Sequence, residues 1–236
     1  MSGRQGESFE ALKARRRGLV QRGSWITYLA CPEEEVRIPP GPDLLAALDP
    51  RLHRKPNGDP LFWDFFVPGP GGYCLEVLKQ GTPEGPVRPV FWACIGPEGG
   101  VELARPVGSR TFTSGRLALG SHGLALDAMG FFQFCAWLYR RLGCEGPVQA
   151  GLMADRVAGL VLDPHPDGEV GGAVLQTESP AHEAALALAE LAAGGPDLVC
   201  VFLNGLYREA VGVPCPHFLA GGSLRQAGRG VALGGR

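Results

Sequence analysis

Residues 87–104, VRPVFWACIGPEGGVELA, decide the fold class that the sequence predicts. Val87–Ile95 and Val101–Ala104 are short runs of β-branched, aromatic and other apolar residues, a composition typical of β-strands. Gly96–Gly100, which lies between them, is rich in glycine and contains a proline, as turns are. The stretch therefore predicts an antiparallel hairpin.

More strands are expected on both sides of this hairpin. Tyr73–Leu78 and Thr111–Leu119 show the alternation and flanking turns that indicate strands. Val148–Met153 and Val157–Leu162 are predicted either as two strands or as one bulged strand. The remaining candidates are Trp25–Ala30 and Val170–Gln176.

Helical spacing of apolar residues predicts about four helices and one short helical turn. The segments are Ser8 to about Arg22, Leu44–Leu48, Asp127–Leu142, a helix starting at Ser179-Pro180 and continuing over Ala184–Ala193, and Leu198–Val211. A strand over Leu198–Leu203 competes with the last helix, because periodicity does not distinguish short apolar runs. The predicted class is α+β, a mostly antiparallel sheet of short strands with packed helices.

Length and composition favour one domain. The chain has 236 residues, 45% of them hydrophobic and 19% charged, which excludes a disordered polyampholyte. The 36 glycines and 21 prolines predict many tight turns. We expect a single domain over residues 1–219, with a sub-boundary near residue 120, and a Gly-rich flexible tail over residues 220–236.

The expected location is cytoplasmic, without a membrane span. The most hydrophobic segment, Phe131–Leu142, is shorter than the roughly 20 residues of a span and contains Arg140 and Arg141. Met1–Gly6 lacks the apolar run of a secretory signal. The seven cysteines form no C-x-x-C pair, so reduced thiols that fill core space are predicted.

Positive charge gathers at the two ends of the chain. Eight of the 22 basic residues lie in residues 11–32 and 210–236, and all 24 acidic residues lie elsewhere, although the net charge is −2. If the ends meet, they form a basic patch suited to phosphates or to an acidic partner; the alternative is a solvated helix face. The predicted binding residues are Lys13, Arg15, Arg16, Arg17, Arg22, Arg225 and Arg229.

Two short segments carry residue types that serve as metal ligands or as general acids and bases. Asp163, His165, Asp167 and Glu169 fall in a proline-containing segment that is also typical of a surface turn. Cys215 and His217 would need Cys144 or His182 to complete a metal site, and a structured loop is the competing interpretation. No cofactor is expected, because G-x-S-x-G, G-x-G-x-x-G and G-x-x-x-x-G-K-[ST] are absent.

Apolar and glycine positions in residues 124–215 carry a resemblance to a known family. They are Phe134, Trp137, Leu138, Tyr139, Gly143, Gly146-Pro147-Val148, Val157-Ala158-Gly159, Leu203, Leu206-Tyr207-Arg208-Glu209-Ala210 and Gly212. This pattern resembles the region that follows the AlbA-type DNA-binding domain in bacterial Schlafen-like proteins. That family's N-terminal signature, a Leu-Glu-Phe-Lys strand with an Asn-x-x-Gly-Gly turn, is not found between Met1 and Gly120. The resemblance implies nucleic-acid-related or defence-related biology and assigns DNA binding to no residue.

The segregated charge predicts a non-catalytic binding or assembly module that contacts nucleic acid or an acidic partner through its basic N-terminal helix. One alternative is a metal-dependent hydrolase or nuclease that uses the segment from Asp163 to Glu169. Another is a structural subunit of a larger complex, suggested by the aromatic cluster Phe62–Phe66.

Overall fold

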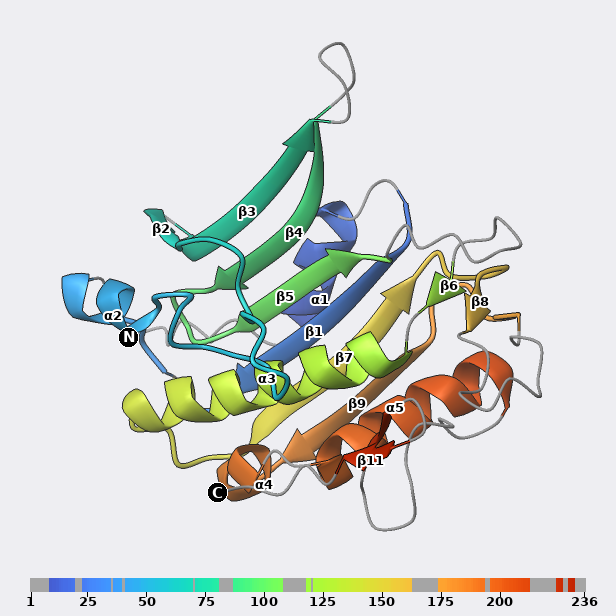
Figure 1. The fold of residues 1–236 in the computed structure, drawn as a ribbon. Helices are drawn as coiled ribbons and strands as arrows, with labels where there is room; N and C mark the ends of the chain where they lie inside the picture. Colours follow the sequence, from blue (N-terminus) through green and yellow to red (C-terminus); the bar gives the residue numbers. More distant parts are fainter. Residues whose placement is uncertain are drawn as a thin grey trace.

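A seven-stranded antiparallel sheet forms the centre of the computed structural model (Figure 1). The structure describes residues 9–19, 23–34, 36–39, 41–69, 71–80, 87–107, 118–119, 121–162, 174–193, 196–212, 224–226 and 229–231. From one edge to the other, the strands are Val67–Gly69 (β2), Gly72–Gln80 (β3), Val87–Ile95 (β4), Val101–Pro106 (β5), Trp25–Pro32 (β1), Val148–Asp155 (β7) and Ala181–Leu186 (β9). The predicted α+β class is confirmed.

Five helices accompany the sheet in the described part of the chain: Phe9–Leu19 (α1), Pro42–Ala47 (α2), Ser121–Arg141 (α3), Leu188–Ala193 (α4) and Pro196–Val211 (α5). Two short strand pairs lie outside it: Ala118–Leu119 (β6) is parallel to Val161–Leu162 (β8), and Leu224–Gln226 (β10) is antiparallel to Arg229–Val231 (β11). None of the described helices is long and apolar enough to cross a membrane.

The hairpin predicted from residues 87–104 is present as β4 and β5. The two strands pair from Ile95 opposite Val101 to Trp92 opposite Ala104. The amide of Gly96 donates to the carbonyl of Gly100 at 2.7 Å, which closes the turn. The strand predicted over Thr111–Leu119 is described only at β6, because residues 108–117 lie outside the described residues.

The helix predicted from Ser179-Pro180 through Ala184–Ala193 is wrong in its first half. Residues 181–186 form β9, which pairs with β7 from Met153 opposite Ala181 to Val148 opposite Leu186. Alanine favours a helix by only a fraction of a kcal/mol over most residues. Strand pairing at the sheet edge outweighs that preference, and the helix is reduced to α4.

Two other helix predictions are resolved by the structure. Helix α3 begins at Ser121, so Asp127 lies in its second turn and does not open the helix. Residues 196–211 form α5, so the competing strand over Leu198–Leu203 is not found.

The main core lies between the sheet and α3, α4 and α5, which cover one face of it (Figure 1). Tyr28 from β1 and Phe131 from α3 meet there with ring centroids 5.8 Å apart. Alternate residues of β1 point to the opposite face, where Leu29 and Cys31 pack with Leu12 of α1 and Met153 of β7. The sheet is therefore covered on both faces at β1, and all eight residues of that strand are buried.

Candidate binding pocket beside helix α3

Most residues of the two predicted metal segments cannot be placed, because Asp163, His165, Asp167, Glu169, Cys215 and His217 lie outside the described residues. Within the described ranges, no group of three or more His, Cys, Asp or Glu side chains could hold a metal ion.

The two residues proposed to complete a metal site have structural roles. Cys144 is buried after α3, where burial and a hydrogen bond with Glu34 raise the pKa of its thiol to about 12. His182 on β9 packs edge-on against Phe202 of α5, with ring centroids 5.3 Å apart.

Lys13 is the predicted phosphate-binding residue whose side chain the structure describes. Its ammonium lies 2.5 Å from a carboxylate oxygen of Glu10 and 3.0 Å from one of Glu183 on β9. Burial alone would lower the pKa of Lys13, but hydrogen bonds to the two carboxylates outweigh this and raise it. The charge of Lys13 is thus already compensated by two acids, and a phosphate would have to displace them.

The other predicted basic residues are placed only by their backbones or not at all. Arg15, Arg16 and Arg17 lie in α1, and Arg225 and Arg229 lie in the β10–β11 hairpin; their side chains and all of Arg22 are outside the description. Figure 1 shows α1 behind the sheet and β11 in front of it. A joint patch formed by both ends of the chain stays a prediction.

A different site lies where one stripe of α3 meets the connection between α2 and β2, residues 48–66. Asp127, Gly130, Phe134, Trp137 and Arg141 follow each other at spacings of three and four, so they share one helix face. The α2–β2 connection folds back on itself opposite that face, because Lys55 and Asp59 pair through a backbone hydrogen bond of 2.8 Å. Together the two elements form the walls of the site.

Buried ion pairs fasten the α2–β2 connection to α3 and β5. One carboxylate oxygen of Asp127 lies 3.1 Å from the Lys55 ammonium, and the other lies 2.9 Å from the Arg105 guanidinium. Arg105 also donates to the carbonyl of Leu61 at 3.0 Å, and its guanidinium lies 5.0 Å from the ring centroid of Phe91. The three charged side chains are only 10–16% exposed, so the single carboxylate neutralises its cations with little screening by water.

Gly130 allows the close approach that this arrangement requires. A Cβ atom at this position would lie 3.1 Å from both Leu61 Cδ1 and Lys55 Cγ. Leu61 is fully buried and Lys55 is tied to Asp127, so a larger residue would force these constrained side chains to shift by a few tenths of an ångström.

His53 forms the apolar floor of the site together with aromatic rings. Its Nε2 lies 2.8 Å from the carbonyl oxygen of Ala47, so this nitrogen carries the proton and donates. Its ring lies 4.6 Å from Trp137 and 4.9 Å from Phe134, centroid to centroid. Burial lowers the pKa of His53 more than the hydrogen bond to Ala47 raises it, so the ring is neutral at pH 7.

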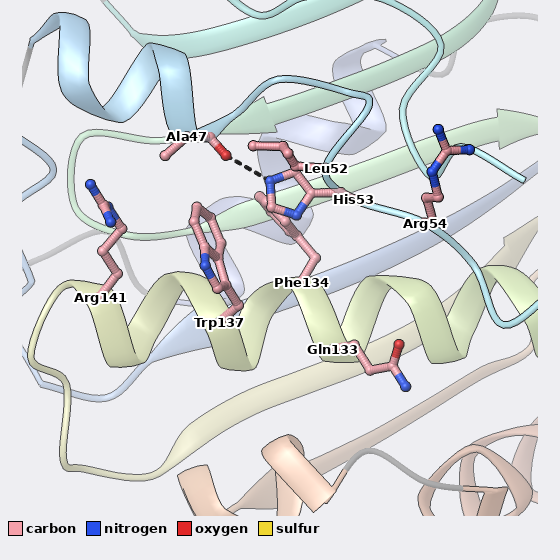
Figure 2. A pocket seen from close by; sticks show the side chains of 8 residues that line it. All are labelled: Ala47, Leu52, His53, Arg54, Gln133, Phe134, Trp137 and Arg141. Carbon is pink, nitrogen blue, oxygen red and sulfur yellow. Dashed lines mark hydrogen bonds between the residues drawn. The ribbon is translucent and has the colours of Figure 1, made fainter. Parts of the chain in front are cut away.

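A cavity of about 450 Å³ opens beside these rings, lined by Ala47, Leu52, His53, Arg54, Gln133, Phe134, Trp137 and Arg141. In Figure 2, Phe134 and Trp137 point from α3 toward His53, with Arg141 and Arg54 on either side of them. Both arginines are exposed, and Arg54 donates to the carbonyl of Gly58 at 2.8 Å. Arg141 forms no ion pair with any residue of the described ranges. The site thus offers an apolar aromatic recess between two cationic edges.

The same connection also exposes large apolar side chains. Leu52, at the pocket itself, is 66% exposed, and Trp63, Phe65 and Val67, the first residue of β2, are each more than half exposed. Phe62 and Phe66 are buried, so the aromatic cluster noticed in the sequence divides into core residues and surface residues. Exposed apolar groups of this size gathered on one segment are typical of interaction surfaces.

Sequence patterns did not reveal this pocket. The stripe that carries Phe134, Trp137 and Arg141 is hidden because α3 is apolar on nearly every side. Asp127 inside the run LALDAMGFF was the available signal, since an acid in such a run needs a buried cationic partner. Its partners Lys55 and Arg105 are far away in the sequence and carry no recognisable spacing.

Comparisons with known proteins found no matching family model, no similar curated protein and no similar solved structure. The resemblance of residues 124–215 to the Schlafen-like region therefore stays a prediction.

Proposed function

We propose that this chain is a binding module that recognises an acidic segment of a partner protein through the pocket beside α3. The observation that carries the proposal is a cavity of about 450 Å³ with an aromatic floor and an exposed guanidinium group at each edge. An acidic partner is one of the two partners expected from the sequence, the other being nucleic acid. We place the binding surface at the pocket and not at α1, because the ammonium of Lys13 is already paired with two carboxylates.

An acidic peptide fits the chemistry of this pocket. A carboxylate can accept hydrogen bonds from the guanidinium of Arg141 or Arg54, and this charge-assisted geometry is stronger than a neutral hydrogen bond. A neighbouring leucine or aromatic side chain can fill the recess against Trp137 and Leu52. The volume lies in the range of about 300–1,000 Å³ typical of ligand pockets, which suits one or two side chains rather than a whole folded domain.

A protein partner is favoured over nucleic acid by the balance of charge and apolar surface. The chain has 24 acidic and 22 basic residues, whereas a phosphate-binding surface relies on many uncompensated cations. The α2–β2 connection instead exposes Leu52, Trp63 and Phe65, which would be buried against an apolar surface of a partner.

Selection from a display library of random-sequence peptides tests the proposal, with the purified chain as bait. We expect enriched peptides to carry Asp or Glu next to a large apolar residue. A fluorescein-labelled copy of an enriched peptide then gives Kd by fluorescence polarisation over a salt series. Binding should weaken with salt, because exposed ion pairs are screened.

Matched variants localise the binding. Arg141→Ala should raise Kd about tenfold, equivalent to about 1.4 kcal/mol, whereas Arg140→Ala, the exposed neighbour that does not line the cavity, should change Kd less than about twofold. Leu52→Ala should also weaken binding, and Val201→Ala, an exposed apolar residue on α5, is its control.

Two results would overturn the proposal. One is a selection that enriches no acidic consensus, or enriched peptides whose Kd does not change in Arg141→Ala and Leu52→Ala. The other is tight binding of fluorescein-labelled DNA or RNA oligonucleotides that depends on Arg15, Arg16 and Arg17, which would support the nucleic-acid alternative.

A further inference from the structure

We propose that Cys74 and Cys94 form a thiol–disulfide site on the sheet face opposite α3, where a low-molecular-weight disulfide oxidises the pair. The two sulfur atoms lie 3.1 Å apart, although the residues are 20 positions apart in the sequence. No C-x-x-C motif marks the pair, because the sheet and not local spacing brings the thiols together. This inference does not depend on the proposed function.

The strand register holds the two cysteines opposite each other. Cys74 of β3 is paired directly with Cys94 of β4 in the antiparallel ladder. Opposite residues in such a ladder have Cα atoms about 4.5 or 5.5 Å apart, depending on the hydrogen-bonding position. Both distances fall in the range of about 4.4–6.8 Å that disulfides occupy. The sulfurs can therefore close to bonding distance without a change of strand pairing.

The pair lies on the α1 side of the sheet. Cys94 is in register with Glu102 of β5, and Glu102 is in register with Leu29 of β1, which packs against Leu12 of α1. Next to the pair on this face, Glu76 is exposed, whereas Tyr73 and Leu75, which flank Cys74 in β3, are buried in the core on the α3 side. A small reagent can thus reach the site from the side opposite the peptide pocket.

Exposure assigns different roles to the two thiols. Cys74 is half-buried, whereas Cys94 is 3% exposed. In the first exchange step a protein thiolate attacks a sulfur of the oxidant, and the more accessible thiolate reaches a bulky disulfide more readily. Cys74 therefore reacts first and Cys94 resolves the mixed disulfide.

Glutathione disulfide oxidises the pair in two exchange steps. The Cys74 thiolate attacks one sulfur of the oxidant, forms a protein–glutathione disulfide and releases a glutathione thiolate. The Cys94 thiolate then attacks Cys74 Sγ, forms the Cys74–Cys94 bond and releases the second glutathione. The two protein thiols are oxidised, the oxidant is reduced to two thiols, and the two protons pass to the departing thiolates.

Incubation of the full chain with glutathione disulfide at about pH 8, near the ordinary pKa of a thiol, tests the site. We expect intact mass spectrometry to show the loss of two hydrogen atoms and no retained glutathione, and peptide mapping to find Cys74 joined to Cys94. Dithiothreitol should reverse the change. Cys144→Ser should behave like the wild type, because the Cys144 thiol has a pKa of about 12 and stays protonated.

Variants separate the two steps. Cys94→Ser should stop at glutathione attached to Cys74, and Cys74→Ser should lose the intramolecular disulfide. The proposal is overturned if the wild-type chain keeps one glutathione on Cys74, if the folded chain stays unmodified while its urea-unfolded form reacts, or if mapping finds other cysteine pairs. The wild-type measurements decide the matter even if a variant fails to fold.

Discussion

Replacing Asp127 with asparagine should destabilise the fold strongly, because it leaves two buried cations without their shared carboxylate. Asparagine keeps the shape and one acceptor oxygen, so the change removes mainly the charge. Lys55 and Arg105 lie 3.1 and 2.9 Å from the carboxylate and are 10% and 16% exposed. Breaking a buried ion pair by removing one partner costs about 3–5 kcal/mol, which for a domain of this size corresponds to roughly 6–20 °C in Tm.

Urea unfolding followed by circular dichroism measures this loss as a lower midpoint at an unchanged m value. Asp43→Asn, at an exposed position in the first turn of α2, is the control and should cost less than about 1 kcal/mol. Lys55→Met added to Asp127→Asn should recover part of the stability, because it removes one unpaired cation. A loss below about 1 kcal/mol for Asp127→Asn, or strictly additive effects in the double variant, would refute the ion-pair argument.

Three further predictions concern other parts of the molecule. Gly205→Ala should cost about 1–3 kcal/mol, since its Cβ would overlap the His182 ring. Adding His182→Ala should recover part of this loss in urea unfolding, and no recovery would contradict the packing. The pKa of His53 should lie below its ordinary 6.5 in an NMR titration, because burial disfavours the charged ring. Its contribution to stability is then complete above pH 6.5 and is lost as the pH falls through the lowered pKa; a measured pKa at or above 6.5 would show that the ring is not buried in solution. A disulfide between Cys74 and Cys94 should stabilise the fold by about 3 kcal/mol for a closed loop of this length, which raises Tm by roughly 6–12 °C. Calorimetry of the reduced and oxidised chain measures this shift, and an equal Tm in both forms would contradict it.

The sheet could be predicted from sequence wherever strand pattern and turn chemistry agree. Val87–Ile95 is found with its predicted bounds, and the glycine-rich turn that follows it closes the hairpin to β5. Residues 181–186 could not be predicted correctly, because alanine has no strand preference and the pairing of β9 with β7 is a tertiary interaction. Local pattern predicts an element well only when the rest of the fold does not compete with it.

The candidate site was less predictable than the fold, because it depends on contacts between distant residues. The basic residues of α1 attract attention as a run, yet Lys13 is paired with Glu183, which is 170 residues away. The pocket is assembled from the α2–β2 connection and a helix face about 80 positions further on, and neither has a motif. Charge runs are visible in a sequence, whereas the partners that neutralise them are not.

The sheet separates the two proposed sites, and this gives a way to tell them apart. Phe134 and Trp137 line the proposed peptide pocket on the α3 face, whereas Cys74 and Cys94 lie on the face that α1 shares. A disulfide between β3 and β4 joins strands whose register already places the cysteines opposite each other, so it requires no displacement of α3. Peptide affinity should therefore be the same in the reduced and oxidised chain. Asp127→Asn, by contrast, loosens the wall of the pocket itself, so its effect on Kd should follow its effect on stability.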